Sequence, residues 1–497
     1  MSDPSKDSLS KKVLAGAGWA MGMRWAIKLL GLASSAIVAR QLMPEDYGLV
    51  AIAVVALGLT QVLFEFGVET AVIQNDAATR KHFDTAWTIR LGQSAIVAMA
   101  LLAFSPFSGE FFDEPRLPLI MQLVSLSVLL QGFENIGIVH FRKNLNFNKD
   151  FQFYVVSKFF SAIITIALAL YLQSYFALVF GMLGQSLVHV IYSYVISDYR
   201  PRFSLAAFAD IWHFSKWLVL KNFADYVGRR GDVIFLTKLA STEGLGFYKW
   251  GYELSSLTTS EIVHPMLRSL MPGLVKVKSE RERLQAAFLL STGMIAMIAV
   301  PLAMGFSAVA AQFVPLFLGG GDKWLGVVPI AEVLAFAAML YSLYLVASNM
   351  LIVIGQVRLA TFASWIRTAL IIASMYPAYQ YSGMSGVAYA QTLIALVSCV
   401  VIYLLLKVQL GMSAWRLLGV LWRPLLAGGV MAWVLYQVPP DMLDGLFALL
   451  LLKVVAGAAI YLGAVFVLWL LSGAPDAAEK KIASMLLGRI QKRSAGA

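Results

Sequence analysis

The stretch ARQLMPEDYGLVAIAV, residues 39–54, joins two long apolar segments through a short turn that holds one proline and two acidic residues. A stretch of the same design, LTKLASTEGLGFYKWG, covers residues 236–251. A shift of 197 residues places Leu42 on Leu239. Because self-similarity at a fixed distance indicates a repeated structural unit, the two stretches predict a chain that contains two copies of one helical unit.

Apolar segments like these fill almost the whole chain. Of its 497 residues, 59% are hydrophobic and 13% are charged, which is far from the composition of soluble globular proteins. A helix of about 20 apolar residues crosses a hydrocarbon core of about 30 Å. The segments are continuously apolar rather than alternating, which excludes a transmembrane β-barrel. We therefore predict an all-α polytopic membrane protein with about fourteen transmembrane helices. The predicted spans cover residues 13–39, 47–74, 84–108, 117–141, 151–172, 175–196, 214–239, 246–273, 285–311, 325–354, 358–380, 384–407, 417–438 and 446–472.

Lysine and arginine are distributed unequally between the loops that join these spans. With a cytoplasmic N-terminus, the outer loops are short and hold few bases: Arg40, Arg116, Lys238 and Lys323 are the exceptions. Cytoplasmic loops are typically enriched in lysine and arginine. The even number of spans then places both termini in the cytoplasm. The inner loops hold Lys11, Lys12, Arg80, Lys81, Arg142, Lys143, Lys149, Arg200, Arg202, Lys276, Lys278, Arg281, Arg283, Arg358, Lys407, Arg416 and Arg423, and the tail adds Lys480, Lys481, Arg489, Lys492 and Arg493.

The repeat sets the expected domain organisation. Six spans are an even number, so both copies enter the membrane in the same direction and are related by a pseudo-twofold axis along the membrane normal. We expect an N-lobe at residues 1–199, a C-lobe at 200–409 and two additional spans at 410–473. Residues 474–497 have apolar positions at helical spacing between bases, which predicts a cytoplasmic amphipathic tail.

Several classes of site are excluded by what the sequence lacks. A single cysteine, Cys399, allows no internal disulfide and no cysteine-based metal site. The phosphate-binding loop, the nucleophile elbow of hydrolases and the paired-histidine zinc motif do not occur. We expect no cofactor and no metal. The net charge of +11 does not indicate nucleic-acid binding, because the excess bases lie in the short loops between spans.

One predicted span carries an unusual number of charges. In KWLVLKNFADYVGRRGDVIFLTK, residues 216–238, the side chains of Lys221, Asp225, Arg229 and Asp232 follow at helical spacing on one face. A charge at the bilayer centre costs about 2.5–3.5 kcal/mol on insertion scales, so this face is expected to avoid lipid. The four residues either form a self-neutralising ladder that lines water or face a substrate cavity.

Two spans of the N-lobe also carry polar faces. Arg24 and Lys28 lie one turn apart in the first span, which contains no acid, and Glu65 and Glu69 lie one turn apart in the second. Arg24 either pairs with Glu65 or contacts a substrate. The acids Glu65, Glu69, Asp225 and Asp232 are candidates for ion coupling or for structural pairing. The eighth span adds Lys249, Glu253 and His264 on one face.

Arginine is suited to phosphate oxygens because its guanidinium group donates two parallel hydrogen bonds. Arg24 with Lys28 and Arg229 with Arg230 are the adjacent cation pairs of these spans. Nearby aromatic residues either stack on sugar rings or belong to the packing and the interfacial belt. They are Trp217, Tyr226, Tyr248, Trp250 and Tyr252.

Residues 38–74, VARQLMPEDYGLVAIAVVALGLTQVLFEFGVETAVIQ, resemble the start of the polysaccharide transporters, the O-antigen and exopolysaccharide flippases. Residues 202–254 resemble their middle, and the length and number of spans match over the whole chain. This family belongs to the multidrug, oligosaccharidyl-lipid and polysaccharide exporter superfamily, which also holds lipid II flippases and multidrug exporters.

The resemblance implies a bacterial inner-membrane protein, not an enzyme, that moves an undecaprenyl-pyrophosphate-linked oligosaccharide outward for lipopolysaccharide or exopolysaccharide synthesis. It also implies partners among the polymerase and other glycan-assembly proteins. In such relatives spans 1, 2, 7 and 8 line a cavity whose cations meet the pyrophosphate. Here that role would belong to Arg24, Lys28, Lys221, Arg229 and Arg230. The acids on the same faces are a departure from a purely cationic site.

Two other functions are compatible with parts of this sequence. A multidrug or organic-cation exporter of the same architecture would have a smaller cavity dominated by acids and aromatic residues. A membrane-bound glycan polymerase or ligase would need a large outer loop, whereas the outer loops here have roughly a dozen residues at most.

Overall fold

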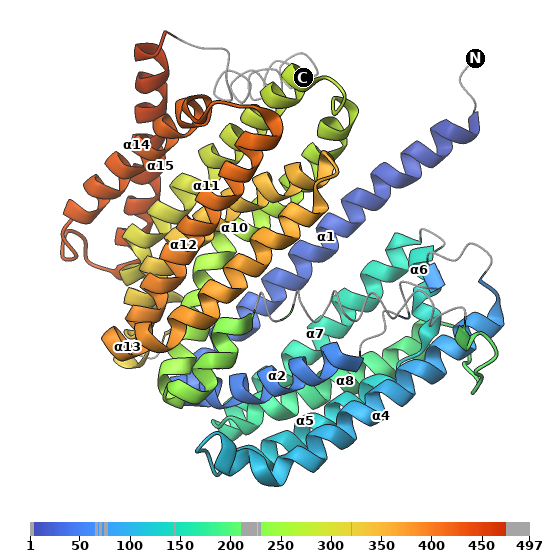
Figure 1. Ribbon diagram of the computed structural model, residues 1–497. Coiled ribbons are helices and arrows are strands. Elements are labelled where there is room, and N and C mark those ends of the chain that lie inside the picture. Colours follow the sequence, from blue (N-terminus) through green and yellow to red (C-terminus); the bar gives the residue numbers. More distant parts are fainter. Residues whose placement is uncertain are drawn as a thin grey trace, which may run out of the picture. The chain divides into compact units, whose positions relative to one another are not determined.

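The computed structural model describes residues 4–64, 68, 72–73, 78–143, 146–209, 226, 230–319 and 321–473. Every regular element within these residues is helical (Figure 1), which confirms the predicted all-α class for this part of the chain. The α-helices are α1 (Pro4–Gln41), α2 (Pro44–Phe64), α4 (Arg80–Phe111), α5 (Leu117–Gly132), α6 (Val139–Lys143), α7 (Phe147–Leu172), α8 (Phe176–Ile196), α10 (Thr242–Lys276), α11 (Arg281–Leu318), α12 (Val327–Val353), α13 (Val357–Leu410), α14 (Ala414–Gln437) and α15 (Leu446–Leu471). The 3-10 helices are η1 (Ile136–Ile138) and η2 (Gly321–Trp324), and residues 230–239 are also helical.

Among the described residues, ten helices are long and apolar enough to cross a membrane, or eleven when α5, η1 and α6 count as one bent span. The helix α13 has 54 residues, about 80 Å at 1.5 Å per residue, which is more than twice the hydrocarbon thickness. Its backbone leaves the helical conformation at Ser382 and Gly383, where the sequence predicts the boundary between two spans. The protein is therefore a multi-pass membrane protein.

The side chains of α5 and α8 are arranged as membrane helices require. Ser127 and Ser186 are buried and their hydroxyl oxygens lie 3.0 Å apart, while the neighbouring Leu126 and Leu187 are each 47% exposed. In a lipid environment leucine gains nothing from burial, whereas small polar residues allow close helix contact and hydrogen bonding. Serine at the interface and leucine outside thus identify the exposed faces of these helices as lipid-facing.

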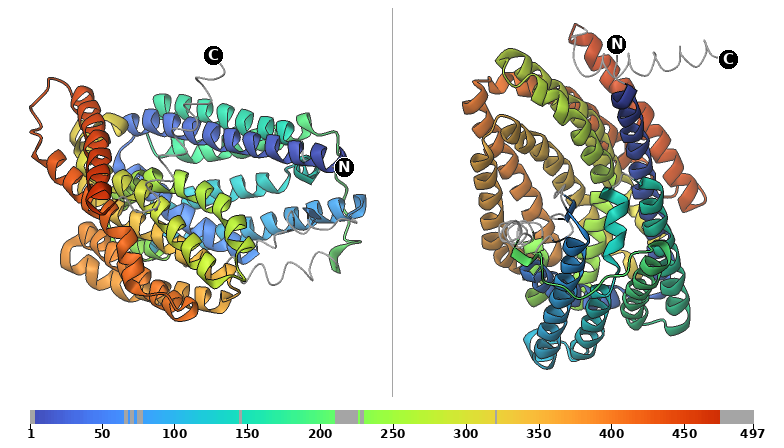
Figure 2. Two further views of the ribbon diagram at one scale, coloured as in Figure 1. Left: turned by 90° about the horizontal axis from the view of Figure 1, so that it is seen from above. Right: turned by 90° about the vertical axis from the view of Figure 1, so that its right-hand side faces the viewer.

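The chain folds into two compact units, and the first contains residues 1–246 and 318–320. Within this unit α4 packs beside α5, and α7 packs against both α1 and α8 (Figures 1 and 2). The helix α2 contacts α4 and α5, and α5 also contacts α8.

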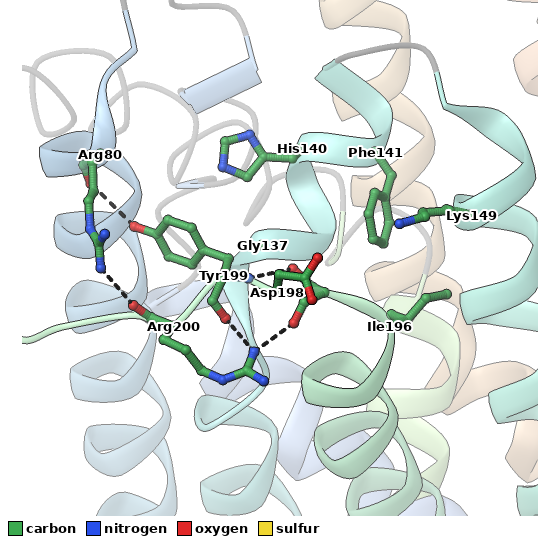
Figure 3. A pocket seen from close by; sticks show the side chains of 10 residues that line it. Arg80, Gly137, His140, Phe141, Lys149, Ile196, Asp198, Tyr199 and Arg200 are labelled. Carbon is green, nitrogen blue, oxygen red and sulfur yellow. Dashed lines mark hydrogen bonds between the residues drawn. The ribbon is translucent and has the colours of Figure 1, made fainter.

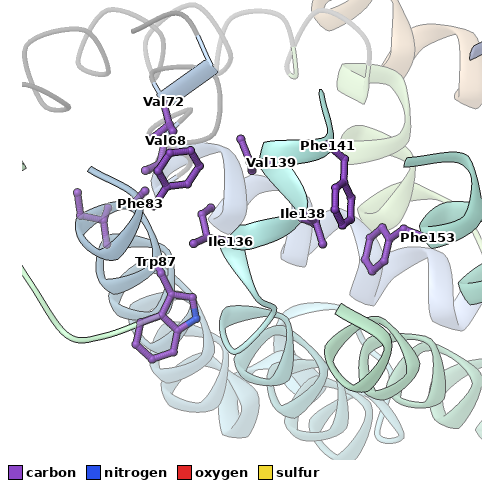
Figure 4. Packing of buried hydrophobic residues seen from close by; sticks show 11 residues of the cluster. Val68, Val72, Phe83, Trp87, Ile136, Ile138, Val139, Phe141 and Phe153 are labelled. Carbon is purple, nitrogen blue, oxygen red and sulfur yellow. The ribbon is translucent and has the colours of Figure 1, made fainter. Parts of the chain in front are cut away.

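A hydrophobic cluster closes the end of this unit at which α4 begins (Figure 4). Phe83 and Trp87 of α4 contribute one side of it, and the imidazole of His140 stacks on the Phe83 ring with 3.9 Å between centroids. Because its residues come from five segments of the chain, the cluster holds the ends of these segments together. Its other buried members are Val68, Val72, Ala86, Ile89, Ile136, Ile138, Val139, Phe141 and Phe153.

The second unit contains residues 247–317 and 321–497. Here α12 packs against α13, and α14 packs against α15. A buried cluster that includes Ala308, Met431 and Tyr461 joins α11 to α14 and α15. The hydroxyl of Tyr461 donates to the carbonyl of Met297 at 3.1 Å. The two C-terminal helices are therefore packed onto α11 rather than attached only by a linker.

The repeated turns of the sequence meet each other inside the first unit. A Cβ atom on Gly48 would lie 1.6 Å from the carbonyl oxygen of Thr242, and one on Gly246 would lie 1.9 Å from that of Pro44. The contact is reciprocal, as expected for two copies related by a twofold axis. It relates 44 to 242 and 48 to 246, an offset of 198. The helix ends show the same offset: one helix ends at residue 41 and the next begins at 44, and in the second copy one ends at 239 and the next begins at 242.

The offset of 197 residues is therefore wrong by one at this turn. The offset of 197 matches Leu42 with Leu239, but leucine recurs often in an apolar sequence and such a match can arise by chance. The offset of 198 matches Gly48 with Gly246, where the close approach of the backbones tolerates only glycine. With the structural offset, Arg40 is equivalent to Lys238.

Candidate functional site

Five of the predicted site residues lie outside the described residues: Glu65, Glu69, Lys221, Asp225 and Arg229. Four others are described, and all four belong to the first unit. Arg24 and Lys28 lie on α1, and Arg230 and Asp232 lie in the helical segment 230–239.

The cationic face of α1 continues onto α7. Arg24 and Lys28 are both partly exposed, and one turn further Gly31 lies beside α7, where the Cε atom of Lys158 is 3.6 Å from the position of a Cβ on that glycine. From Arg24 to Gly31 the axial distance is about 10 Å at 1.5 Å per residue. Arg24 and Lys28 thus lie on α1 within two turns of Gly31, the residue beside which Lys158 of α7 lies.

The helices α1 and α7 run in the same direction. The ring of Trp19 lies 5.1 Å from that of Phe151, and further along both helices Gly31 lies beside Lys158. Parallel spans need an odd number of crossings between them. The helices α2 and α4, with α5, η1 and α6 as one bent span, provide three.

The sequence analysis does not include Lys158 among the candidate site residues. Lys158 is the twelfth residue of the 26-residue helix α7 and is partly buried. Within the part of the chain that the structure describes, its ammonium group makes no ion pair. The sequence does indicate its importance through its distance from both ends of the helix, because a lysine at that depth reaches the membrane interface with difficulty.

Asp232 and Arg230 have different surroundings. Asp232 is 4% exposed, and its carboxylate accepts a hydrogen bond of 2.8 Å from the backbone N–H of Val233. Arg230 is exposed. Within this helical segment Asp232 is thus buried and Arg230 is exposed.

Most of the described aromatic candidates are packing residues. Tyr248 is fully buried, and Trp250 is 4% exposed and packs edge-on against Trp324. The hydroxyl of Tyr226 donates to the carbonyl of Val55 on α2 at 3.2 Å. Tyr252 remains exposed at 39%. Trp217 lies outside the described residues.

Arg90 and Glu134 form an ion pair in which Glu134 is buried and Arg90 is partly buried. The guanidinium Nη2 of Arg90 lies 2.8 Å from Oε2 of Glu134, and Nδ1 of His189 lies 3.9 Å from the same oxygen. Removal of one partner from a buried pair typically costs about 3–5 kcal/mol, because the remaining charge stays buried. This cluster joins α4, α8 and the bend between α5 and η1, and its role is structural.

A second charged network lies at the opposite end of the first unit. Arg116 pairs with both Glu114 and Glu45, and Asp46 accepts hydrogen bonds from the backbone N–H groups of Met43 and Tyr175. Hydrogen bonding to Arg116 lowers the pKa of the Glu114 carboxyl below its ordinary value of 4.5. The network joins the start of α2 to the α4–α5 and α7–α8 loops, all of which the charge bias assigns to one side of the membrane.

Comparison with known proteins agrees with this architecture. A family model described as "Polysaccharide biosynthesis protein" matches residues 37–329. The lipopolysaccharide biosynthesis protein WzxC of Escherichia coli K12 is 25% identical over 433 residues, covering 84% of this chain and 85% of that protein. The teichuronic acid biosynthesis protein TuaB of Bacillus subtilis is 23% identical over 427 residues, covering 82% and 85%.

Among solved structures, the lipid II flippase MurJ in an inward closed conformation superposes with a TM-score of 0.69 at 15% identity, covering 91% of this chain and 98% of that one. At this identity the likeness shows the fold alone. The family model, by contrast, spans more than half of the sequence. The chain therefore belongs to the polysaccharide biosynthesis protein family.

Proposed function

We propose that this protein is a flippase that moves an undecaprenyl-pyrophosphate-linked oligosaccharide from the inner to the outer leaflet of the bacterial inner membrane. The observation that carries the proposal is the group of cations that α1 and α7 hold within membrane-spanning helices: Arg24, Lys28 and Lys158. The pyrophosphate is the part of such a substrate whose negative charge most needs to be neutralised inside a membrane. Lysine and arginine bind it through charge-assisted hydrogen bonds. The family and the roles named for WzxC and TuaB support the same class of substrate.

The proposed architecture has fourteen spans in two parallel lobes, residues 1–199 and 200–409, followed by two spans at 410–473 and a cytoplasmic tail at 474–497. Rocking of the lobes around a midplane site would give alternating access. The glycan and the pyrophosphate cross in the polar cavity while the prenyl chain stays in lipid. The protein performs no covalent chemistry, and both termini face the cytoplasm.

The proposed site residues divide into two groups. Substrate contacts come from Arg24, Lys28 and Lys158, together with Lys221, Arg229 and Arg230 of the seventh span. The acids Glu65, Glu69, Asp225 and Asp232 serve ion coupling or structural pairing. The hydrogen bond from Val233 to the buried Asp232 carboxylate favours a structural role for that residue. Membrane lipid and the glycan-assembly proteins, including a polymerase, are the proposed partners.

The test is transport by the purified full chain in proteoliposomes. A fluorescent undecaprenyl-pyrophosphate oligosaccharide, loaded into both leaflets, should become accessible to an external quencher faster than in protein-free vesicles. The same lipid without pyrophosphate should not. Unchanged accessibility of the labelled lipid, together with active extrusion of an organic cation, would establish a multidrug exporter instead.

A further inference from the structure

A polar pocket of about 530 Å³ opens at the end of the first unit where α4 begins (Figure 3). Its walls come from the start of α4, from η1 and α6, from the start of α7, and from the segment 196–200 after α8. The pocket lies next to the hydrophobic cluster of Figure 4, because His140 stacks on Phe83 of that cluster and Phe141 belongs to both. The packing of the hydrophobic cluster therefore holds the His140 and Phe141 side of the pocket in place.

Three cations line this pocket: Arg80, Lys149 and Arg200. One acid, Asp198, also lines it, so the charged side chains at the wall sum to +2. His140 contributes an imidazole ring whose face is already covered by Phe83.

Neutral groups contact all three cations, and one of the three, Arg80, also pairs with a carboxylate. Nη1 of Arg200 donates to the carbonyl oxygens of Ser197 and Tyr199 at 2.7 and 2.9 Å. Nη2 of Arg80 donates to the carbonyl of Arg200 at 3.3 Å, and Nε of the same guanidinium group lies 3.7 Å from the carboxylate of Asp84. The ammonium group of Lys149 lies 5.4 Å from the centre of the Phe141 ring. Carbonyl oxygens and a ring orient Arg200 and Lys149 without cancelling their charges, so the pocket is prearranged for an anion.

The adjacent chain segment is both anchored and apolar. Backbone N–H groups of Arg202, Ser204 and Ala207 donate to the side chains of Asp84, Thr88 and Thr85 on α4 at 3.0–3.2 Å. Three of its apolar side chains are exposed: Phe203, Leu205 and Phe208 are 74%, 61% and 43% exposed, and the Phe203 ring meets Trp87 of α4 edge-on at 5.0 Å. Fixed aromatic and aliphatic side chains beside bases are typical of the membrane interface, where headgroups meet acyl chains.

We propose that this pocket binds the phosphate group of an anionic membrane lipid, whose acyl chains lie along Phe203 and Leu205. Basic pockets between helices at the cytoplasmic side of membrane proteins are suited to such headgroups. Arg80, Lys149 and Arg200 would contact the phosphate, and Asp198 would favour a headgroup with hydroxyl donors, such as glycerol, over a more highly charged one. The bound lipid would brace the ends of α4, α7 and α8. This site is independent of the proposed substrate cavity and of transport.

The test measures lipid binding to the delipidated full chain in detergent by native mass spectrometry. Phosphatidylglycerol and phosphatidylcholine of equal chain length serve as probes. We expect one phosphatidylglycerol to bind at least about 10-fold more tightly than phosphatidylcholine, and Lys149→Gln to weaken phosphatidylglycerol about 5-fold, the usual effect of one base near a membrane surface. Lys149→Arg should retain the affinity. Lys278→Gln, the same change on an exposed inner-loop lysine outside the pocket, should have no effect.

Three outcomes would overturn the assignment. The first is equal affinity for the two lipids, and the second is an equal loss in Lys149→Gln and Lys278→Gln, which would indicate diffuse surface charge. The third is displacement of phosphatidylglycerol by inorganic phosphate or by undecaprenyl pyrophosphate at equimolar concentration, which would assign the pocket to a free anion or to the proposed substrate. Because the assay does not use transport, failure here leaves the proposed function unaffected.

Discussion

Single residues decide which charges within the helices are structural and which are available for a ligand. Arg90 is neutralised at 2.8 Å by Glu134, whereas Lys158, on another helix of the same unit, has no ion-pair partner among the described residues. Both are basic residues inside apolar helices, and the sequence alone gives them the same description. What separates them is a contact with a residue 44 positions away, which no local pattern reports.

Loss of the Lys158 ammonium group should impair transport without loss of the fold. We expect Lys158→Gln to reduce the transport rate about 10-fold, the effect of one charge-assisted hydrogen bond, and Lys158→Arg to retain most of it. The measurement is quencher accessibility of the labelled lipid in proteoliposomes, with thermal stability recorded alongside. Lys278→Gln is the matched control. Full activity of Lys158→Gln would show that this lysine only extends toward the interface.

The network around Arg116 should make stability depend on pH. Because Arg116 lowers the native pKa of Glu114 below 4.5, the carboxylate stabilises the fold fully above that pH, and this contribution is lost as the pH falls through the native pKa. We expect the melting temperature of the wild type to fall between pH 6 and pH 3.5 by more than that of Glu114→Gln. Glu280→Gln removes a carboxylate from an exposed pair with Arg283 and should leave the wild-type pH dependence in place.

At the scale of the element, the sequence predicts breaks where glycine and serine mark them and misses those made by distant contacts. The break in α13 at Ser382 and Gly383 falls between two predicted spans. The predicted span 117–141, by contrast, is bent by 59° after Gly132. There Asn135 caps η1 by accepting the N–H of Gly137, and its amide donates to the carbonyl of Tyr199 at 2.6 Å. The second contact lies 64 residues away and leaves no trace in local hydropathy.

The repeated turn should be sensitive to a single methyl group. A Cβ on Gly48 would lie 1.6 Å from a backbone oxygen of Thr242, so α2 and α10 must move apart. We expect Gly48→Ala to lower the free energy of unfolding by about 1–3 kcal/mol, the usual effect of overpacking. Gly92→Ala is the control, since nothing lies within 4 Å of the new atom and alanine favours the helix by about 1 kcal/mol. Chemical denaturation in mixed micelles measures both, and an equally stable Gly48→Ala would refute the reciprocal contact.

At the scale of the whole molecule, the sequence repeat and the contacts between residues divide the chain at different places. The repeat places the lobe boundary near residue 199, whereas the contacts group residues up to 246 with the first unit. The turn before α10 explains the difference, because it packs on its equivalent between α1 and α2. The predicted lobes follow the sequence repeat and stay a prediction. The chain class and the approximate positions of the long helices followed from apolar length alone, while the candidate site needed contacts between segments far apart in sequence.

The final prediction concerns the orientation of the chain in the membrane. The inner-loop bases Arg80, Lys149 and Arg200 line one pocket, and the outer-loop residues Glu45 and Arg116 pair with each other at the opposite end of the unit. The structure thus groups these loops as the charge bias does. The enrichment of bases then indicates which end is cytoplasmic. Fusions of green fluorescent protein after Lys12, Lys278 and Arg493 should fluoresce, and alkaline phosphatase should be active only after Asp322. Active phosphatase after Lys278 would mean an odd number of crossings before that loop, and neither the fourteen-span topology nor the cytoplasmic assignment of the pocket would survive it.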